Sequence, residues 1–188
     1  MVKLGFAHTS RKILSRKLLQ FDDGTVIIDE RQLKKVCDGY KFTAGYRFTS
    51  VGSGDEVNII LNVPVNSNRR IFFLAFEISS FAQAHINVYF DVEFNGGSPI
   101  KIINLNRAKE GIINSKAQVL HSATYTSNEY LIPLVHTGGT KQFATGGLSE
   151  LSGAAILESE NNILIAVINK STSTQDISLR LVWWEEKI

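Results

Sequence analysis

Residues able to carry out chemistry are spread thinly along this sequence. Its four histidines, His8, His85, His121 and His136, are far apart, and no H-x-H or H-E-x-x-H spacing supplies two zinc ligands from one segment. Strands can bring distant histidines together, so a metal site stays open as a minor alternative. The single cysteine, Cys37, cannot form a disulfide within the chain, and we interpret it as a small packed side chain. The sequence therefore predicts neither a metal nor a cofactor.

Patterns typical of catalysis are equally sparse. Nucleophilic catalysis needs an activated Ser or Cys beside a base, and no G-x-S-x-G motif is present. Asp91 and Glu93 could face one cleft as a glycosidase pair, but we interpret them as the solvated face of a strand. Residues 137–147 are rich in glycine, yet Gln142 follows Lys141, so the ending of a phosphate-binding loop is missing. We expect a protein that is not an enzyme.

A basic segment opens the chain. The first twenty residues contain no acidic residue and five basic ones, Lys3, Arg11, Lys12, Arg16 and Lys17, whereas the whole chain has a formal charge of only +2. The segment could be a solvated helix face, a contact with a neighbouring protein, or a contact with nucleic acid or membrane. It has few aromatic residues for stacking on bases, so nucleic acid is not favoured. The basic residues interrupt every apolar run, so neither a secretory signal nor a membrane helix is predicted.

The elements that must position these residues differ along the chain. Residues 10–21 carry apolar residues at helical spacing, which predicts a short amphipathic helix or a docking arm. Asp23-Gly24 predicts a turn, residues 25–28 a strand, and residues 30–37 one or two helical turns.

From Tyr40 onward, β-branched and aromatic runs recur between clusters of Gly, Asn and Ser. About ten short strands in this part predict an all-β fold, an antiparallel jelly-roll-like β-sandwich with an N-terminal basic arm or short helix. The division is residues 1–39 for the arm and 40–188 for the sandwich. Asn95-Gly96-Gly97 predicts a hairpin turn, and residues 160–162 predict the turn of the penultimate hairpin. The predicted core is Phe72, Leu74, Phe76, Ile86, Val88, Phe90, Val92, Ile165, Val167, Leu179 and Leu181.

Two stretches interrupt the strand pattern, and such loops are frequent binding sites on a rigid sandwich. They are residues 107–116 and the glycine-rich residues 137–147. Asn104, Asn106 and Arg107 can be interpreted as a partner-facing cluster or as side chains that cap a loop, and the second interpretation is preferred. The candidate partner-binding residues are Arg11, Lys12, Arg16, Lys17, Asn104, Asn106, Arg107, Lys141 and Phe143.

From Tyr40 to its end, the chain resembles the jelly-roll structural proteins of tailed bacteriophages and related viruses, especially capsid decoration or cement proteins, head fibres and turrets. The resemblance lies in segments 42–49, 59–64, 102–107 and 179–185. It implies a non-enzymatic virion protein, made in the host cytoplasm, that lies on the capsid surface. Its partners would be the capsid protein or sister subunits, with a homo-oligomer, first of all a trimer, expected.

An alternative is a carbohydrate- or receptor-binding jelly-roll module of a viral tail or spike. Exposed aromatic rings in a shallow groove would favour it, and the candidates are Tyr125, Tyr130, Trp183 and Trp184. Neighbouring residues of a strand point to opposite faces, so one of the two tryptophans is expected in the core and the other exposed or at an interface.

Overall fold

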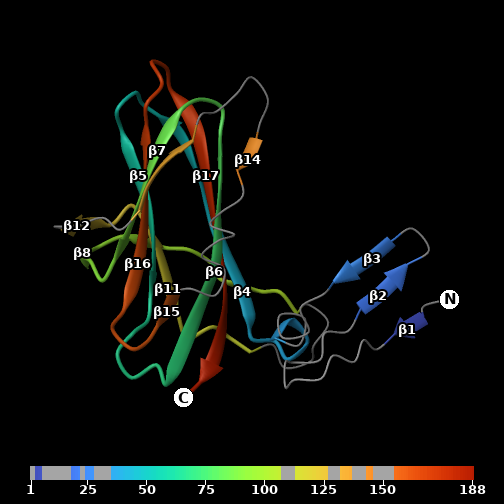
Figure 1. Cartoon of the computed structure of the whole chain (residues 1–188). Coiled ribbons are helices and arrows are strands. Elements are labelled where there is room, and N and C mark those ends of the chain that lie inside the picture. The colour runs from blue at the N-terminus through green and yellow to red at the C-terminus, as the bar shows by residue number, and fades with distance from the viewer. Residues whose placement is uncertain are drawn as a thin grey trace.

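A computed structural model of the 188-residue chain gives its architecture (Figure 1). The backbone is described for residues 3–5, 18–21, 24–27, 35–106, 113–126, 132–136, 143–145 and 155–188. Side chains are described for 35–106, 113–126, 133 and 155–188.

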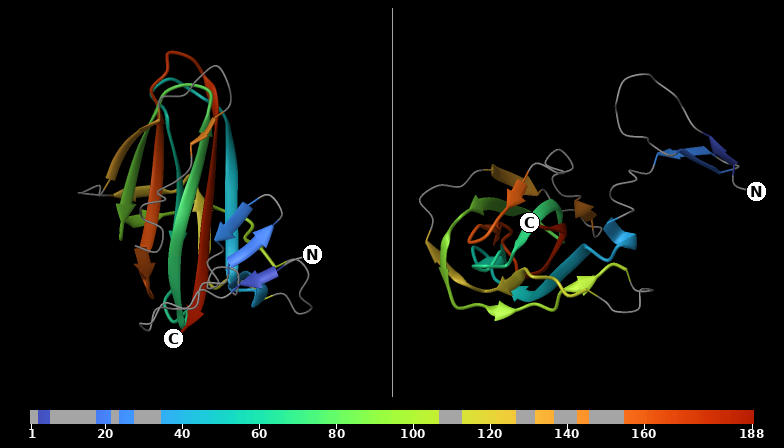
Figure 2. Two further views of the ribbon diagram at one scale, coloured as in Figure 1. Left: turned by 45° about the vertical axis from the view of Figure 1, so that its right-hand side comes forward. Right: turned by 90° about the horizontal axis from the view of Figure 1, so that it is seen from below.

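Two antiparallel sheets pack face to face, which confirms the predicted all-β sandwich (Figure 2). The first sheet has the order β10-β4-β17-β6-β14, and β15 also pairs with β6. Its strands are β4 (Lys41–Val51), β6 (Arg69–Ser80), β10 (Ile103–Asn104), β14 (Phe143–Thr145), β15 (Ala155–Leu157) and β17 (Gln175–Lys187). The second sheet has the order β13-β7-β16-β5-β11-β9. Its strands are β5 (Glu56–Asn62), β7 (Ala84–Phe90), β9 (Ser98–Pro99), β11 (Gln118–His121), β13 (Ile132–His136) and β16 (Asn162–Asn169).

The strand order is that of a jelly roll. Successive long strands alternate between the sheets, with β14 and β15 together forming the sixth strand along one side of β6. Only β4, β5, β6, β7, β13, the β14–β15 pair, β16 and β17 are counted here, as the first to the eighth strand in chain order. On this count the first sheet has the order first (β4), eighth (β17), third (β6) and sixth (β14–β15). The second sheet has the order second (β5), seventh (β16), fourth (β7) and fifth (β13). The predicted turn before Asn162 is present, because Asn161 N donates to Glu158 O at 3.0 Å. The predicted hairpin is wrong, however, since β15 and β16 lie in different sheets.

Apolar residues at alternate strand positions fill the space between the sheets as predicted. In β6 the inward-facing positions shift by one residue. Nine predicted core residues are buried, but Phe72 and Phe90 are only half-buried. In the β6–β17 ladder, Val182 lies opposite Ala75 and Trp183 opposite Phe73, so Leu74 is an extra residue on β6. This bulge turns Phe73 inward in place of Phe72.

A smaller apolar cluster lies on the outer face of the second sheet. Ile60, Tyr89 and Leu164 pack there against Val92 and Ala123, beside the ribbon formed by β8 (Glu93–Asn95) and β12 (Thr124–Thr126). The hairpin predicted at Asn95-Gly96-Gly97 is wrong. The same register continues through both glycines, with Asn95 opposite Thr124 and Ser98 opposite His121. The glycines bend this strand rather than reverse it, and both have positive φ.

The N-terminal part contains a separate three-stranded sheet in the order β1-β2-β3 (Figure 1). Its strands are β1 (Lys3–Gly5), β2 (Leu18–Phe21) and β3 (Gly24–Ile27). The helix predicted over residues 10–21 is therefore wrong for Leu18–Phe21, whose backbone pairs with both neighbouring strands. β3 agrees with the strand predicted at 25–28. Of the predicted glycine-rich loop at 137–147, residues 143–145 form strand β14 instead.

The described end of the predicted helical turns is residues 35–37. It closes in a Schellman motif, because Tyr40 N donates to Lys35 O at 2.9 Å and Gly39 N to Val36 O at 3.0 Å. Gly39 has the positive φ of 78° that this cap requires. The chain then enters β4 directly.

Candidate binding groove at the open edge of the sandwich

The residues singled out from the sequence fall in different places. Arg11, Lys12, Arg16, Lys17, Arg107 and Lys141 lie outside the described residues, and Phe143 is placed only as part of the backbone of β14. Asn104 and Asn106 are described. Asn104 belongs to β10, which pairs with the start of β4, and Asn106 lies two residues further along the chain.

Asn104 and Asn106 hold the chain together locally. The Asn104 side chain is buried, and its Nδ2 donates to Gly39 O at 2.7 Å and to Ile113 O at 2.9 Å, while its Oδ1 accepts from Asn106 N. Asn106 Nδ2 donates to Cys37 O at 2.7 Å. This is the bonding pattern of side chains that cap a loop. The Cys37 residue is itself exposed, contrary to the packed side chain expected from the sequence.

Above these residues, β4 forms an open edge of the first sheet. On the side away from β17, β4 pairs only with β10, at Phe42 and Thr43, among the described strands. Leu105 N donates to Lys41 O on this side. Because backbone groups alternate sides along a strand, the N–H and C=O groups of Gly45, Arg47 and Thr49 face the same open side. No described strand pairs with these three exposed residues on this side, so their hydrogen-bonding groups are available to a partner.

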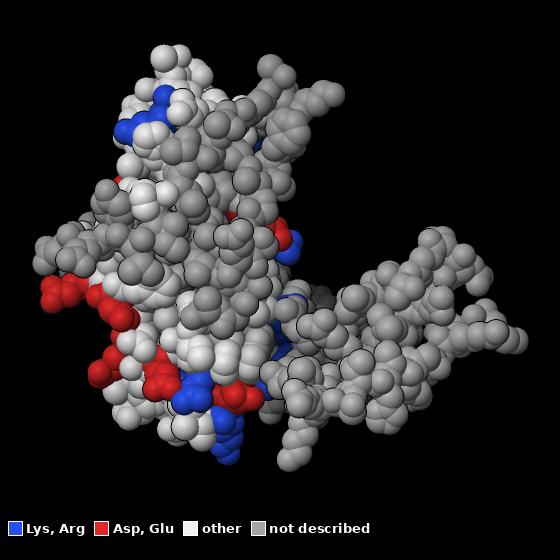
Figure 3. All heavy atoms as spheres, in the orientation of Figure 1, with Lys and Arg blue, Asp and Glu red and all other residues white. Residues whose placement is uncertain are grey.

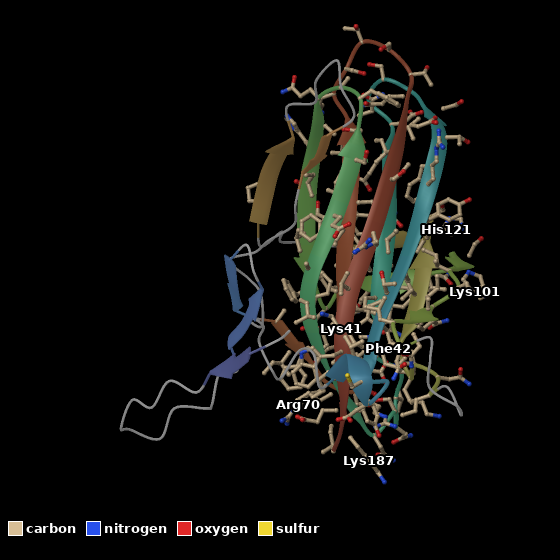
Figure 4. The ribbon with its side chains drawn as sticks, turned by 90° about the vertical axis from the view of Figure 1, so that its right-hand side faces the viewer. Lys41, Phe42, Arg70, Lys101, His121 and Lys187 are labelled. Carbon is tan, nitrogen blue, oxygen red and sulfur yellow. The ribbon has the colours of Figure 1, made fainter. Side chains whose placement is uncertain are left out.

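A groove of about 420 Å³ lies beside this edge, lined by Tyr46, Arg47, Phe48, Thr49, Val51, Asp55, Glu56, Val57 and Ser122. It lies between β4 of the first sheet and the start of β5 in the second. Tyr46 is 39% exposed and stacks on His121 of β11, with ring centroids 3.7 Å apart and planes at 15°. Phe48 meets both rings edge-on, at 4.9 Å and 5.9 Å. Figure 4 shows His121 beside β4, farther along the strand than Lys41 and Phe42.

The charges around the groove are mostly fixed by local partners. Arg47 Nη2 lies 2.6 Å from Asp176 Oδ2, and Asp176 Oδ1 accepts from Ser50 N at 2.9 Å. These bonds lower the pKa of Asp176 below its ordinary value. The hydrogen bond from Ser50 N has the largest effect, and the bond from Arg47 has the next largest. Asp55 accepts from Gly52 N at 3.1 Å, and Glu56 accepts from the Tyr125 hydroxyl at 2.9 Å. The groove thus keeps the acidic pair Asp55 and Glu56, while the charge of Arg47 is matched by Asp176.

Two titratable rings near the groove are held in their neutral forms. Burial lowers the pKa of His121, so its imidazole is uncharged at neutral pH, and its Nδ1 lies 3.0 Å from Ser122 Oγ. Burial, followed by the hydrogen bond to Glu56, raises the pKa of Tyr125 far above its ordinary value. The neutral His121 ring, stacked on Tyr46, closes the edge of the sandwich beside the groove.

The tryptophans behave as the strand pattern predicts. Trp183 is fully buried, whereas Trp184 lies on the outer face. One face of Trp184 stacks on Phe72, with centroids 3.7 Å apart and planes at 6°, and Lys35 Nζ lies 4.3 Å from the ring centroid. Lys35 also pairs with Glu186 at 3.0 Å. Trp184 therefore anchors the end of the N-terminal segment to the sandwich.

Charges of both signs gather near the end of the sandwich where β17 ends (Figure 3). There, Arg70 of β6 pairs with Glu158 at 2.6 Å. Mixed charge at this end does not form a docking surface of one sign. The described residues contain no group of three His, Cys, Asp or Glu side chains that could hold a metal ion.

Fold and groove together define a jelly-roll β-sandwich with an open edge suited to binding. The chain matches no protein-family model, and no curated protein or solved structure is significantly similar to it. In the part of the chain that the structure describes, no helix is long and apolar enough to span a membrane.

No sequence signal pointed to the groove. Tyr46 and His121 belong to strands of different sheets, and neither lies in a motif. Only the jelly-roll topology, which places the β4 edge opposite β11, brings them together.

Proposed function

We propose that this protein is a non-enzymatic virion structural protein that decorates or cements a viral capsid through protein–protein contacts. The observation that carries the proposal is a jelly-roll sandwich that follows a basic N-terminal segment. The described end of that segment, residues 35–40, is bonded to the sandwich. The sandwich supplies a rigid body, and the segment supplies basic residues outside its core.

The root of the segment supports a docking role. Lys35 is held over Trp184, and the cap at Gly39 and Tyr40 fixes how the chain enters β4. Asn104 and Asn106 bind the carbonyls of Gly39 and Cys37. The described end of the segment, residues 35–40, is therefore held on the sandwich by hydrogen bonds and aromatic packing.

The test is to isolate native particles that contain the protein and to ask, by electron microscopy and sedimentation, whether it lies on a shell. A variant with Lys12, Arg16 and Lys17 changed to Ala should attach at least about tenfold more weakly at physiological salt. The three charges would lie within the screening length of roughly 8 Å from an acidic partner surface, so their removal takes away an attraction that salt does not abolish. The matched control changes three exposed lysines of the sandwich, Lys101, Lys170 and Lys187, to Ala, with the same change of net charge. Equal attachment of both variants, or absence of the protein from any shell, would contradict the proposal.

The alternative, a carbohydrate- or receptor-binding module, has one observation in its favour, the exposed ring of Tyr46 beside the polar groove. The aromatic residues suggested for it from the sequence are largely occupied. Trp183 is buried, Trp184 is covered by Phe72 and Lys35, and the hydroxyl of Tyr125 donates to Glu56. Tyr130 lies outside the described residues. Binding of soluble oligosaccharides that is lost in Tyr46→Ala would favour this alternative.

A further inference from the structure

The open edge of β4 and the groove beside it form one continuous surface. Two kinds of recognition are therefore available side by side, from backbone groups along the edge and from side chains in the groove. This combination is typical of sites at which an extended segment adds a strand to a sheet.

We propose that strand β1 (Lys3–Gly5) of a second copy of the chain adds to the free edge of β4. The inference deepens the proposed function. It rests on that function in one respect, the expectation that several copies of the chain associate. It names the contact between copies, whereas the proposed function concerns attachment to a shell.

The backbone geometry sets the length of the added strand. Pairing with β10 ends at Thr43, and at the other end Ser50, with a φ of 57°, lies in a bulge that interrupts the regular ladder just before β4 ends at Val51. Between them, Gly45, Arg47 and Thr49 offer N–H and C=O groups on the open side. A three-residue strand such as β1 can pair with at most two of these three positions, so it fits between the two limits.

Among the described strands, β1 also has a free edge. In the order β1-β2-β3, β2 is central, so β1 can pair with β4 while it stays paired with β2 through Lys3–Gln20, Leu4–Leu19 and Gly5–Leu18. Nothing in the small sheet has to be broken. The contact would join the small sheet of one copy to the first sheet of the other.

Charge selects β1 over the other edge strand, β3. The groove carries Asp55 and Glu56, and Arg47 is already matched by Asp176. β1 contains Lys3 and belongs to a stretch with no acidic residue in its first twenty positions. β3, in contrast, is flanked by Asp23 and Asp29. Opposite charges steer the basic segment toward the groove and like charges disfavour β3.

A second copy is a reachable donor. With the small sheet intact, residues 28–34 join it to Lys35 and could span roughly 25 Å if extended, so the sheet can reach a sandwich that lies next to its own. Pairing between copies then gives an association that depends on protein concentration, whereas pairing within one copy does not.

The first experiment uses the unaltered full chain. Sedimentation over a range of concentrations measures association, and hydrogen exchange at low and high concentration measures protection of the amides of Gly45, Arg47 and Thr49. We expect amides among these three to become protected as the oligomer forms, and a synthetic peptide of residues 1–10 to compete with association. A chain that stays monomeric with these amides unprotected would overturn the proposal. Protection in a monomer would place the chain's own segment on the edge and would overturn the second copy as donor.

Matched variants test each side of the contact. Thr49→Pro removes one outward N–H and should weaken association at least about tenfold, while Thr49→Ala keeps the N–H and should change it less than about twofold. On the donor side, Leu4→Pro and Leu4→Ala form the same pair of tests outside the sandwich, so they remain informative if Thr49→Pro impairs folding. Association of both proline variants at the unaltered strength would refute the strand addition. Attachment to a shell is measured separately: attachment without self-association sinks only this inference, and self-association without attachment sinks only the proposed function.

Discussion

Glu185 provides the sharpest test of how the sandwich is held together. Its carboxylate is 1% exposed, at the end of β17 beside the buried Trp183. It accepts hydrogen bonds from Ser115 Oγ, from Lys116 N at 3.1 Å and from Trp183 Nε1 at 3.3 Å. Arg69 Nε lies 4.0 Å away. One carboxylate thus ties β17 to the segment that leads into β11.

Glu185→Gln keeps the shape of the side chain but replaces one accepting oxygen with an NH2 group. That group faces donors, and Arg69 loses its buried counter-charge. Hydrogen bonds to a charged group contribute about 1.5–3 kcal/mol each, and removing one partner of a buried pair costs about 3–5 kcal/mol. Since one oxygen remains, we expect a loss of about 2–4 kcal/mol in the free energy of unfolding, measured by urea denaturation.

Glu186→Gln is the matched control, because Glu186 is the next residue and pairs with Lys35 at the surface. An exposed pair of this kind contributes roughly 0–1 kcal/mol. If the two variants unfold at the same urea concentration, Glu185 does not carry the stabilisation that its burial and bonds imply.

Three further predictions concern other parts of the fold. Gly97→Ala should destabilise by about 1–3 kcal/mol in the same assay, because Gly97 has a φ of 92° and an added Cβ would lie 3.1 Å from the Cβ of Ala123; Gly54→Ala, with a φ of 83° and open space, should cost less. Trp184→Ala should cost about 1–2.5 kcal/mol through lost ring stacking and the lost Lys35 contact, and hydrogen exchange at Gly39 and Tyr40 should become faster; unchanged exchange would show that Trp184 does not anchor the N-terminal segment. The pKa of Asp176 is lowered in the folded chain, so its stabilisation is present above the ordinary value of 3.8 and is lost as pH falls through the lower folded value; the melting temperature of Asp176→Asn should vary less with pH in that acidic range than that of the unaltered chain.

The fold class was predictable because strand patterning is local. Alternation of apolar and polar residues indicates which face of a strand is buried, and it holds for Ile86 and Val88 in β7 and for Leu179 and Leu181 in β17. It fails at Phe72, where the sequence is apolar on both parities. The bulge at Leu74 decides which ring turns inward, and that bulge depends on the pairing of β6 with β17, strands far apart in the sequence.

At Asn95-Gly96-Gly97 the sequence predicted a change of backbone conformation but not the direction in which the chain continues. Asn95-Gly96-Gly97 has the composition of a hairpin turn, and its glycines do adopt positive φ. A strand from residues 118–126 already pairs on both sides of it, however, so the chain continues in the same direction. Local composition specifies the backbone conformation, whereas the partner strand decides what that conformation does.

The candidate groove could not have been predicted from the sequence, because it lies at a sheet edge that only the topology leaves uncovered. The same uncovered edge is what could bind a partner strand. A jelly roll leaves an open side wherever its edge strands are not covered, and an uncovered edge invites uncontrolled pairing. Here β10 covers the start of β4, the stack of Tyr46 on His121 closes the interior, and the bulge at the left-handed Ser50 interrupts the ladder near the end of β4. In the part of the chain that the structure describes, the open positions are Gly45, Arg47 and Thr49, beside a groove that contains Asp55 and Glu56. An edge shortened from both ends can accept one short strand but cannot template a continuous sheet, which is the property that a specific contact between subunits requires.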